Sequence, residues 1–301
     1  MQLGMIGLGR MGANMAQRLS RGGHAVVGFD LSPDARARIE AEGIAAAGSV
    51  EALVASLDAP RALWMMVPAG AVVDATIDAL LPLLSPGDVL VDGGNSFYGD
   101  SQRRAARLAE QGIAYLDVGT SGGVWGLAEG YSLMVGGDAA AGERLSPLFA
   151  TLAPAPDRGW GRVGRSGAGH FAKMVHNGIE YGMMQAYAEG FAILERKHAL
   201  VPDPAQVAEI WRHGSVVRSW LLDLAAQALA ANPRLEGIAA YVPDSGEGRW
   251  TVAEAIELDV AAPVITQSLI ERLRSREDNA FSDRLLSAMR NAFGGHAIRR
   301  D

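Results

Sequence analysis

The sequence predicts an α/β domain with a mostly parallel sheet, followed by an all-helical domain. Residues 1–165 alternate short apolar runs with amphipathic stretches, which is the pattern of βαβ units. Beyond residue 165 the strand signal fades and long helical periodicities follow. The chain has 301 residues, 49% of them hydrophobic, which is enough to form two ordinary cores. We therefore expect a first domain at 1–165 and a second domain at 166–301.

Each strand of the first domain is predicted from a short apolar run bounded by turn residues. In chain order these runs are Gln2–Ile6, Ala25–Phe29, Ala62–Val67, Val89–Asp92, Ala114–Val118 and Ser132–Gly136. The amphipathic stretches between them predict helices at Met11–Arg21, Pro33–Glu42, Gly70–Leu84 and Ser101–Gln111. In the second domain we expect helices at Gly169–His198, Pro204–Arg212, Val216–Ala231, Thr251–Leu258, Ala262–Ser275 and Phe281–Asn291.

The composition excludes several classes of protein. The net charge is −7, so we expect no broad basic surface for nucleic acid or for an anionic membrane. The absence of cysteine excludes disulfides, thiolate nucleophiles and cysteine metal sites. The first apolar run starts at Leu3 and meets Gly7 at once, and no later run reaches the roughly 18 apolar residues of a membrane span. We therefore expect a cytoplasmic protein without a membrane partner.

A glycine motif follows the first predicted strand and opens the first predicted helix. It reads Gly7-Leu8-Gly9-Arg10-Met11-Gly12, the G-x-G-x-x-G pattern of a Rossmann-like dinucleotide site, in which backbone N–H groups approach a pyrophosphate. Taken alone, the motif could be a plain glycine turn. The second predicted strand, however, leads directly into Asp30. Its carboxylate can accept hydrogen bonds from the adenosine ribose and would repel a 2′-phosphate, so we expect NAD as the cofactor.

Polar and glycine-rich segments follow the next three predicted strands. Val67 and Pro68 end one strand, where a nicotinamide ribose commonly lies. Asn95 follows the next strand, and Ser121, Gly122 and Gly123 follow the one after it. These positions fall at the carboxyl edge, where an open α/β sheet binds its ligands. We therefore expect these segments to line the ligand site, with Asn95 among the residues that bind the cofactor.

One predicted helix carries a polar stripe. Lys173, Asn177 and Glu180 are spaced i, i+4 and i+7, which places them on one face with His176 beside them. The spacing alone could be a polar seam without function. Lys173 is, however, one of two lysines in a chain whose other basic side chains are arginines, the second being Lys197. A desolvated lysine can act as a general base where an arginine cannot.

Several segments together carry a specific resemblance. The longest is Gly169-His170-Phe171-Ala172-Lys173-Met174-Val175-His176-Asn177-Gly178-Ile179-Glu180-Tyr181-Gly182, and the others are Asp92-Gly93-Gly94-Asn95, Ser121-Gly122-Gly123, Gly248-Arg249-Trp250-Thr251 and Arg290-Asn291-Ala292-Phe293-Gly294-Gly295-His296. They resemble the substrate signatures of 6-phosphogluconate dehydrogenases. The resemblance covers nearly the whole chain.

The resemblance implies a role for each matching residue. Lys173 matches the family's general base, and Glu180 matches its general acid. The positions that match sugar-acid ligands are Asn95, Ser121, Gly122, Gly123, His176 and Asn177. The positions that match phosphate ligands are Tyr181, Arg272, Arg290 and His296, the last two reaching in from a second subunit. A small sugar acid is thus the implied substrate, and a homodimer or homotetramer is the implied assembly.

Two departures from the larger enzymes of the family stand out. Their helical domain is a duplicated unit, whereas the residues after Gly169 can hold only one copy, so the chain resembles the short-chain, NAD-dependent branch. Where they carry a lysine and a threonine for the phosphate, this chain offers Ser245 and Glu247. A carboxylate is a poor phosphate ligand. Either the arginines suffice, or the preferred substrate is gluconate itself.

The implied reaction oxidises C3 of 6-phospho-D-gluconate with NAD and releases CO₂, giving D-ribulose 5-phosphate, a step of the pentose phosphate pathway and of gluconate utilisation. We expect no metal, since the sequence lacks an H-x-x-x-H helix and a compact carboxylate cluster. One alternative is a 3-hydroxyacid dehydrogenase of the 3-hydroxyisobutyrate or tartronate semialdehyde type, which does not decarboxylate. Another is a non-catalytic NAD sensor. Glu180 and the His176-Asn177 pair favour the decarboxylating enzyme.

Some charged residues are assigned no function. Arg103 and Arg104 are adjacent on a predicted helix, and Arg299 and Arg300 lie at the chain end. Paired arginines of this kind are most often solvated surface charges, which contribute little to stability. We expect all four to be exposed.

Overall fold

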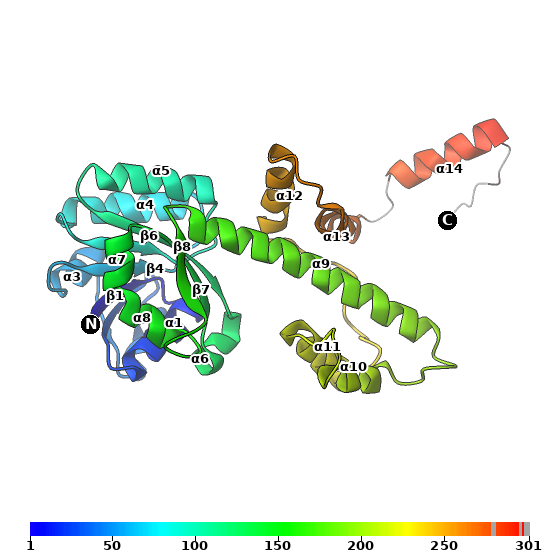
Figure 1. The fold of residues 1–301 in the computed structure, drawn as a ribbon, viewed down its shortest axis with the longest axis horizontal. Coiled ribbons are helices and arrows are strands. Elements are labelled where there is room, and N and C mark those ends of the chain that lie inside the picture. Colours follow the sequence, from blue (N-terminus) through cyan, green and yellow to red (C-terminus); the bar gives the residue numbers. More distant parts are fainter. Residues whose placement is uncertain (278–280, 295–296, 298–301) are drawn as a thin grey trace. The chain divides into compact units, whose positions relative to one another are not determined.

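The computed structural model describes residues 1–277, 281–294 and 297. The chain divides into two compact units, Met1–His176 and Asn177–Asp301. Helix α9 (Ala168–Arg196) begins in the first unit and continues into the second (Figure 1). The first unit therefore includes the initial turns of the helix that carries Lys173.

The first unit is built on one eight-stranded sheet. Its strands are β1 (Gln2–Ile6), β2 (Ala25–Phe29), β3 (Ala45–Ala46), β4 (Ala62–Met65), β5 (Val89–Asp92), β6 (Ala114–Ser121), β7 (Ser132–Gly137) and β8 (Trp160–Gly164). They lie in the order β3-β2-β1-β4-β5-β6-β7-β8, and every pair is parallel except β6 with β7. The predicted mostly parallel α/β sheet is confirmed. Two strands were not expected, because β3 has two residues and β8 contains two glycines and an arginine.

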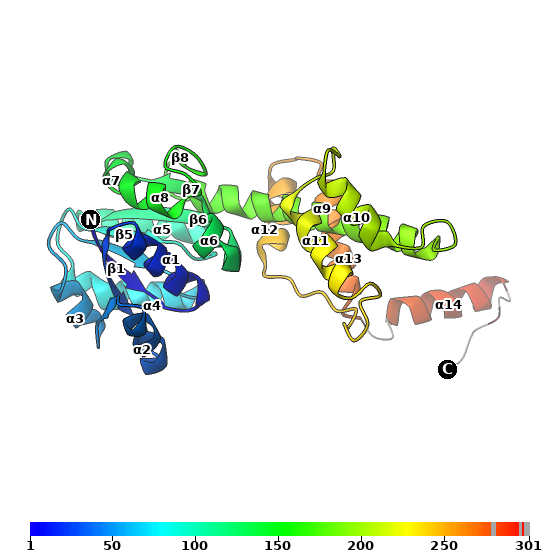
Figure 2. The same ribbon diagram turned by 90° about the horizontal axis from the view of Figure 1, so that it is seen from below.

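Helices cover both faces of this sheet. They are α1 (Arg10–Arg21), α2 (Pro33–Ala41), α3 (Val50–Ala55), α4 (Ala71–Leu80), α5 (Tyr98–Ala109), α6 (Gly126–Glu129), α7 (Ala139–Arg144) and α8 (Ser146–Leu152), with short 3₁₀ turns at Leu81–Leu83 and Gly123–Trp125. Helices α1 and α8 pack on one face, and α4 and α5 pack on the other (Figures 1 and 2). Both faces are therefore shielded from water, as a parallel sheet requires.

Alternate residues of the central strands feed two separate cores. Trp64 and Val91 point into the core beneath α1 and α8, whereas Leu63 and Leu90 point into the core beneath α4 and α5, and all four are fully buried. This period of two explains why these strands read as continuous apolar runs. The two cores fix the sheet, and its carboxyl edge then presents the loops that matter for function.

In the second unit, every regular element among the described residues is a helix. After α9 these are α10 (Pro204–Arg212), α11 (Trp220–Ala231), α12 (Glu247–Glu257), α13 (Pro263–Arg274) and α14 (Phe281–Gly294). The predicted all-helical second domain is confirmed. Helix α12 begins four residues earlier than the expected Thr251, because Gly246 adopts a left-handed φ of +103° and turns the chain into the helix. Over the described residues, no helix is long and apolar enough to cross a membrane.

Candidate active site

The glycine motif forms a tight turn between β1 and α1. Gly7 has a φ of +92°, and a Cβ added at Gly12 would collide with the carbonyl oxygen of Gly7, so both positions require glycine for the backbone to close. Gly9 is different, since a Cβ added there would meet nothing within 4 Å. The open space at Gly9 lies at the N-terminus of α1, where a pyrophosphate can approach backbone N–H groups. The turn thus fits a dinucleotide.

Asp30 is held against this turn. Its Oδ2 accepts a hydrogen bond from the Leu8 N–H at 2.7 Å, and its Oδ1 accepts one from the Ser32 N–H at 2.8 Å. Arg36 donates to the backbone carbonyl of Asp30 at 2.6 Å. Backbone N–H groups therefore orient the carboxylate next to the glycine motif, as is required of a residue that binds the adenosine ribose.

The other residues predicted to bind the cofactor lie at the same two element boundaries that the sequence indicated. Arg10 and Met11 are the first residues of α1, while Val67 and Pro68 follow β4.

The amino end of α9 is anchored on the sheet by Asp117. This fully buried carboxylate of β6 accepts hydrogen bonds from the backbone N–H groups of Gly167 at 2.7 Å and His170 at 2.9 Å. It satisfies two N–H groups that a helix start leaves without partners, and its charge complements the helix dipole. A Cβ added at Gly119, two residues further along β6, would collide with Cβ of Lys173. The helix thus lies directly on the strand that leads to the Ser121 loop.

Three predicted site residues lie together in the first unit. Nζ of Lys173 is 3.4 Å from Nδ1 of His176, and Nε2 of His176 is 3.4 Å from Oγ of Ser121. Lys173 is 8% exposed, which removes most of the water that would compete for its amine. His176 therefore connects the lysine to the loop after β6.

The loops after β5 and β6 lie at the same edge of the sheet, since the two strands pair in parallel with Asp92 opposite Asp117. Asn95 is exposed on the loop after β5. Gly122 and Gly123 have φ values of +137° and +51°, conformations that favour glycine, and they turn the chain after Ser121. The edge predicted from the sequence therefore does bring Asn95 and Ser121 to one side of the unit.

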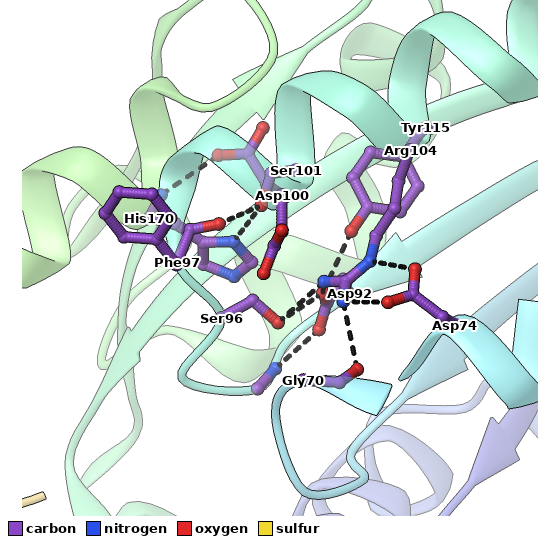
Figure 3. Close-up of polar contacts among 12 residues, drawn as sticks. Gly70, Asp74, Asp92, Ser96, Phe97, Asp100, Ser101, Arg104, Tyr115 and His170 are labelled. Atoms are coloured by element: carbon purple, nitrogen blue, oxygen red, sulfur yellow. Dashed lines mark hydrogen bonds and ion pairs between the residues drawn. The ribbon is translucent and has the colours of Figure 1, made fainter. Parts of the chain in front are cut away.

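A buried charge network lies beneath the Asn95 loop (Figure 3). Asp92 accepts hydrogen bonds from the Gly94 N–H at 3.1 Å, the Ser96 hydroxyl at 2.7 Å and the Tyr115 hydroxyl at 2.9 Å. Arg104 completes the network with 1% of its side chain exposed. The expectation of a solvated Arg104 was wrong, because position 104 falls on the buried face of α5 with Ser101 and Leu108. Arg103 is 54% exposed, as expected.

In the second unit, Tyr181 and Arg272 lie together. The Arg272 guanidinium lies 3.5 Å from the centre of the buried Tyr181 ring, a cation–π contact. The Tyr181 hydroxyl accepts a hydrogen bond from the Ser245 N–H at 3.3 Å. Nearby on the chain, Glu247 is 2% exposed, and neither carboxylate oxygen has a hydrogen-bond partner within the described residues.

The remaining predicted residues are placed as follows. Asn177 is buried, and Glu180 is partly buried one turn further along α9. Arg290 is exposed on α14, and His296 lies outside the described residues. The described residues contain no group of three or more His, Cys, Asp or Glu side chains that could hold a metal ion. Asp92, Arg104 and Asp117 were not expected as site residues, although Asp92 stands in the quoted Asp92-Gly93-Gly94-Asn95 segment.

Comparison with known proteins agrees with this geometry. The family model of the NAD-binding domain of 6-phosphogluconate dehydrogenase matches residues 2–161, and the model of the 6-phosphogluconate dehydrogenase C-terminal domain matches residues 169–284. The NAD(+)-dependent, decarboxylating 6-phosphogluconate dehydrogenase of Haloferax volcanii is 48% identical over 302 residues, covering 100% of this chain and 99% of its own.

Solved structures give a similar result. A 6-phosphogluconate dehydrogenase of Plasmodium falciparum superposes with a TM-score of 0.85 at 28% identity. The superposition includes 100% of this chain and 66% of the Plasmodium falciparum chain. A 3-hydroxyisobutyrate dehydrogenase of Mycobacterium tuberculosis superposes with a TM-score of 0.72 at 25% identity, and covers 89% of this chain and 90% of its own.

The sheet, the glycine turn and Asp30 define an NAD-binding oxidoreductase whose second unit is helical. The matches over both units are more specific than that class. The chain belongs to the 6-phosphogluconate dehydrogenase family, and the resemblance to this family's short-chain type is confirmed.

Proposed function

We propose that the protein oxidises 6-phospho-D-gluconate at C3 with NAD and releases CO₂, forming D-ribulose 5-phosphate. The observation that carries the proposal is the buried Lys173, 3.4 Å from His176 and seven residues before Glu180 on the same helix. A base and an acid on one helix suit a reaction that first removes a proton and later returns one. The end-to-end similarity to the Haloferax volcanii enzyme supports the same reaction.

The first step assigns proton transfer to Lys173. The neutral amine takes the proton of the C3 hydroxyl as C3 loses hydride, and NAD accepts that hydride when bound. His176 lies within 3.4 Å of both Lys173 and Ser121, so it can keep the amine directed toward the sugar acid while Ser121 binds a hydroxyl. Asn95 and Asn177 supply further hydrogen bonds to the substrate.

The later steps assign two roles to α9. Oxidation leaves a ketone at C3, β to the carboxylate, and protonated Lys173 donates its proton to the ketone oxygen as the C1–C2 bond breaks and CO₂ leaves, which gives an enediol. Glu180 then protonates the former C2, which becomes C1 of ribulose 5-phosphate, while Lys173 takes the proton back from the enediol oxygen and the ketone re-forms. No metal is required, since the ketone oxygen takes up the electron pair.

Tyr181 and Arg272 are proposed to bind the phosphate. An arginine that stacks on an aromatic ring is held with its N–H donors at the ring edge, and a guanidinium matches phosphate oxygens in geometry. Arg290 and His296 are proposed to join them from the second subunit of a homodimer or homotetramer. Ser245 and Glu247 offer no cation, so the phosphate would depend on the arginines.

The competing proposal is a 3-hydroxyacid dehydrogenase. The shared fold of the Mycobacterium tuberculosis 3-hydroxyisobutyrate dehydrogenase supports this alternative. A reaction without decarboxylation needs no acid at Glu180. The Plasmodium falciparum enzyme has the higher TM-score, 0.85 against 0.72, and matches 100% rather than 89% of this chain, which favours the decarboxylating enzyme.

The test is to measure NADH formation and CO₂ release with 6-phosphogluconate and with gluconate, each offered NAD and NADP. We expect stoichiometric NADH and CO₂ from 6-phosphogluconate with NAD. Preference for gluconate would assign the site around Ser245 and Glu247 to an unphosphorylated acid. NADH from a 3-hydroxyacid without CO₂ would overturn the proposal in favour of the competing one.

A further inference from the structure

Arg104 lies at the junction of two loops of the first unit (Figure 3). Its guanidinium makes five hydrogen bonds, which matches the five N–H donors of an arginine. Nε and Nη2 donate to the two carboxylate oxygens of Asp74 at 2.9 and 3.1 Å, and Nη2 also donates to the Gly70 carbonyl at 3.0 Å. Nη1 donates to Ser96 at 3.3 Å and to Asp92 at 3.5 Å.

These partners belong to two segments of the candidate site. Gly70 and Asp74 hold the end of the β4–α4 loop (residues 66–70), which includes Val67 and Pro68. Asp92 and Ser96 hold the β5–α5 loop (residues 93–97), which includes Asn95. One side chain therefore fixes a loop expected at the nicotinamide and a loop expected at the sugar acid.

The two loops are also in direct contact. A Cβ added at Gly94 would lie 3.0 Å from the carbonyl oxygen of Val67, so the backbones are closely packed there. Ser96 is 4% exposed and turns inward to Asp92, whereas its neighbour Asn95 is exposed. A shift of Ser96 would therefore move Asn95 relative to Val67.

The positive charge of Arg104 and the negative charges of Asp74 and Asp92 stabilise one another. The Arg104 hydrogen bond lowers the pKa of Asp74 to about 2, against an opposing effect of burial and with help from Arg103. Burial opposes the charge on Arg104, yet the hydrogen bond of Asp74 and the charge of Asp92 raise its pKa overall. The guanidinium therefore stays charged. Moving its partners away would leave a buried charge unpaired, which is strongly unfavourable, so the partners are held in place.

We propose that Arg104 is a positioning residue, which sets the distance between the β4–α4 loop and the β5–α5 loop and so aligns the nicotinamide end of the cofactor with the sugar acid at Asn95. The inference rests on the proposed function for the identity of the two ligands. Arg104 acts on both ligands indirectly, through Asp92, Ser96 and Gly70.

The same strand offers a matched control at its other end. Asp88 immediately precedes β5, is fully buried, and pairs with Arg61 at 3.1 Å. Asp92 ends β5 and pairs with Arg104. The Arg61 pair lies at the amino edge of the sheet and the Arg104 pair at the carboxyl edge, so only the second lies beside the candidate site.

The experiment compares Arg104→Gln with Arg61→Gln in the full chain. For Arg104→Gln we expect kcat/KM for 6-phosphogluconate to fall about 10- to 100-fold, since a displacement of about 1 Å can cost about 100-fold in rate. ADP lacks both the nicotinamide and its ribose, so we expect it to reach only the glycine motif and Asp30 and to bind within about twofold of wild type. Arg61→Gln should lower the melting temperature while leaving kcat/KM within about threefold of wild type.

A purely structural role predicts a different result. If both variants lost similar thermal stability and both kept kcat/KM within about threefold of wild type, the positioning role would be overturned. If Arg104→Gln does not fold, Ser96→Ala replaces it, with an expected loss of about fivefold in kcat/KM at unchanged ADP affinity, and an unchanged kcat/KM would overturn the role. If the wild type oxidises another 3-hydroxyacid, the proposed function fails but the same variants test Arg104 with that acid.

Discussion

Nζ of Lys173 lies 3.4 Å from Nδ1 of His176, one turn further along α9. The lysine is buried, and the imidazole is held in turn by Ser121. A buried amine with a fixed hydrogen-bond partner is suited to proton transfer, because its direction is set before the substrate arrives.

The Lys173→Ala variant should therefore lose turnover while keeping the cofactor. We expect kcat to fall by more than tenfold, about 1.4 kcal/mol or more in the barrier, with NAD affinity near that of wild type. Steady-state kinetics and calorimetric titration with NAD would measure the two effects. Lys197→Ala is the matched control, since it removes the other lysine of the chain from an exposed position. A Lys173→Ala enzyme that keeps more than about a tenth of kcat would exclude the lysine as the base.

Glu180→Gln should act on a later step. The amide cannot donate the proton that C1 of the enediol requires, so we expect hydride transfer and CO₂ release to occur normally in the first turnover, while ribulose 5-phosphate formation slows by about 100-fold or more. Deuterium incorporation at C1 in D₂O, followed by NMR, would report that step directly. Glu189→Gln, an exposed glutamate further along α9, serves as the control. Unchanged product formation in Glu180→Gln would place the acid at another residue.

Gly9→Ala should separate folding from cofactor binding. A Cβ at position 9 meets nothing within 4 Å, so the melting temperature should stay within about 2 °C of wild type. The methyl group would nevertheless occupy the space that a pyrophosphate needs, and NAD affinity should fall by about tenfold or more. Gly161→Ala, where a Cβ also meets nothing within 4 Å, is the control for the substitution itself. Normal NAD binding by Gly9→Ala would mean that the cofactor does not use this turn.

We expect Asp30 to favour NAD over NADP. Its carboxylate is fixed by the Leu8 and Ser32 N–H groups, and Asp30→Asn removes its negative charge while Arg36 stays beside it. The ratio of kcat/KM for NADP to that for NAD should rise by about tenfold or more, since repulsion of the 2′-phosphate is lost. Asp34→Asn, an exposed carboxylate on the same helix as Arg36, should leave the ratio unchanged. An equal ratio in wild type and Asp30→Asn would show that another residue selects the cofactor.

Periodicity and motif context predicted the sheet, the cofactor turn and the helix of Lys173, because each depends on residues close in sequence. The network around Arg104 depends on packing between α4, α5 and the strand ends, so its partners could not be assigned in advance. One signal was present nonetheless. Ser101, Arg104 and Leu108 follow helical spacing on the buried face of α5, so Arg104 could have been recognised as an inward-facing charge.

Asp117 is a second residue whose partners could not be predicted from the sequence. It sits within an apolar strand, where a carboxylate needs a partner, yet its partners are N–H groups about fifty positions later in the chain. The sequence marks such a residue as unusual but does not identify its partner.

Strand β8 was not predicted because its own residues lack a strand pattern. Gly161, Arg162 and Gly164 interrupt the apolar pattern that a strand of this sheet would show.

The pKa of Asp74, lowered to about 2 mainly by the Arg104 hydrogen bond, predicts a specific acid sensitivity. Because the folded pKa lies below the unfolded value of about 3.9, this carboxylate contributes stability that is complete above about pH 4 and is lost as the pH falls through about 2. Asp74→Asn should lower the free energy of unfolding at pH 7 by about 2 kcal/mol and flatten its decline over that acid window. Urea unfolding between pH 7 and pH 2 would measure both effects. Asp78→Asn, one turn along α4 in a more exposed pair with Arg107, should cost at most about 0.5 kcal/mol. Equal losses in the two variants would show that Asp74 is no better paired than a surface carboxylate, and that Arg104 holds the β4–α4 loop through Gly70 alone.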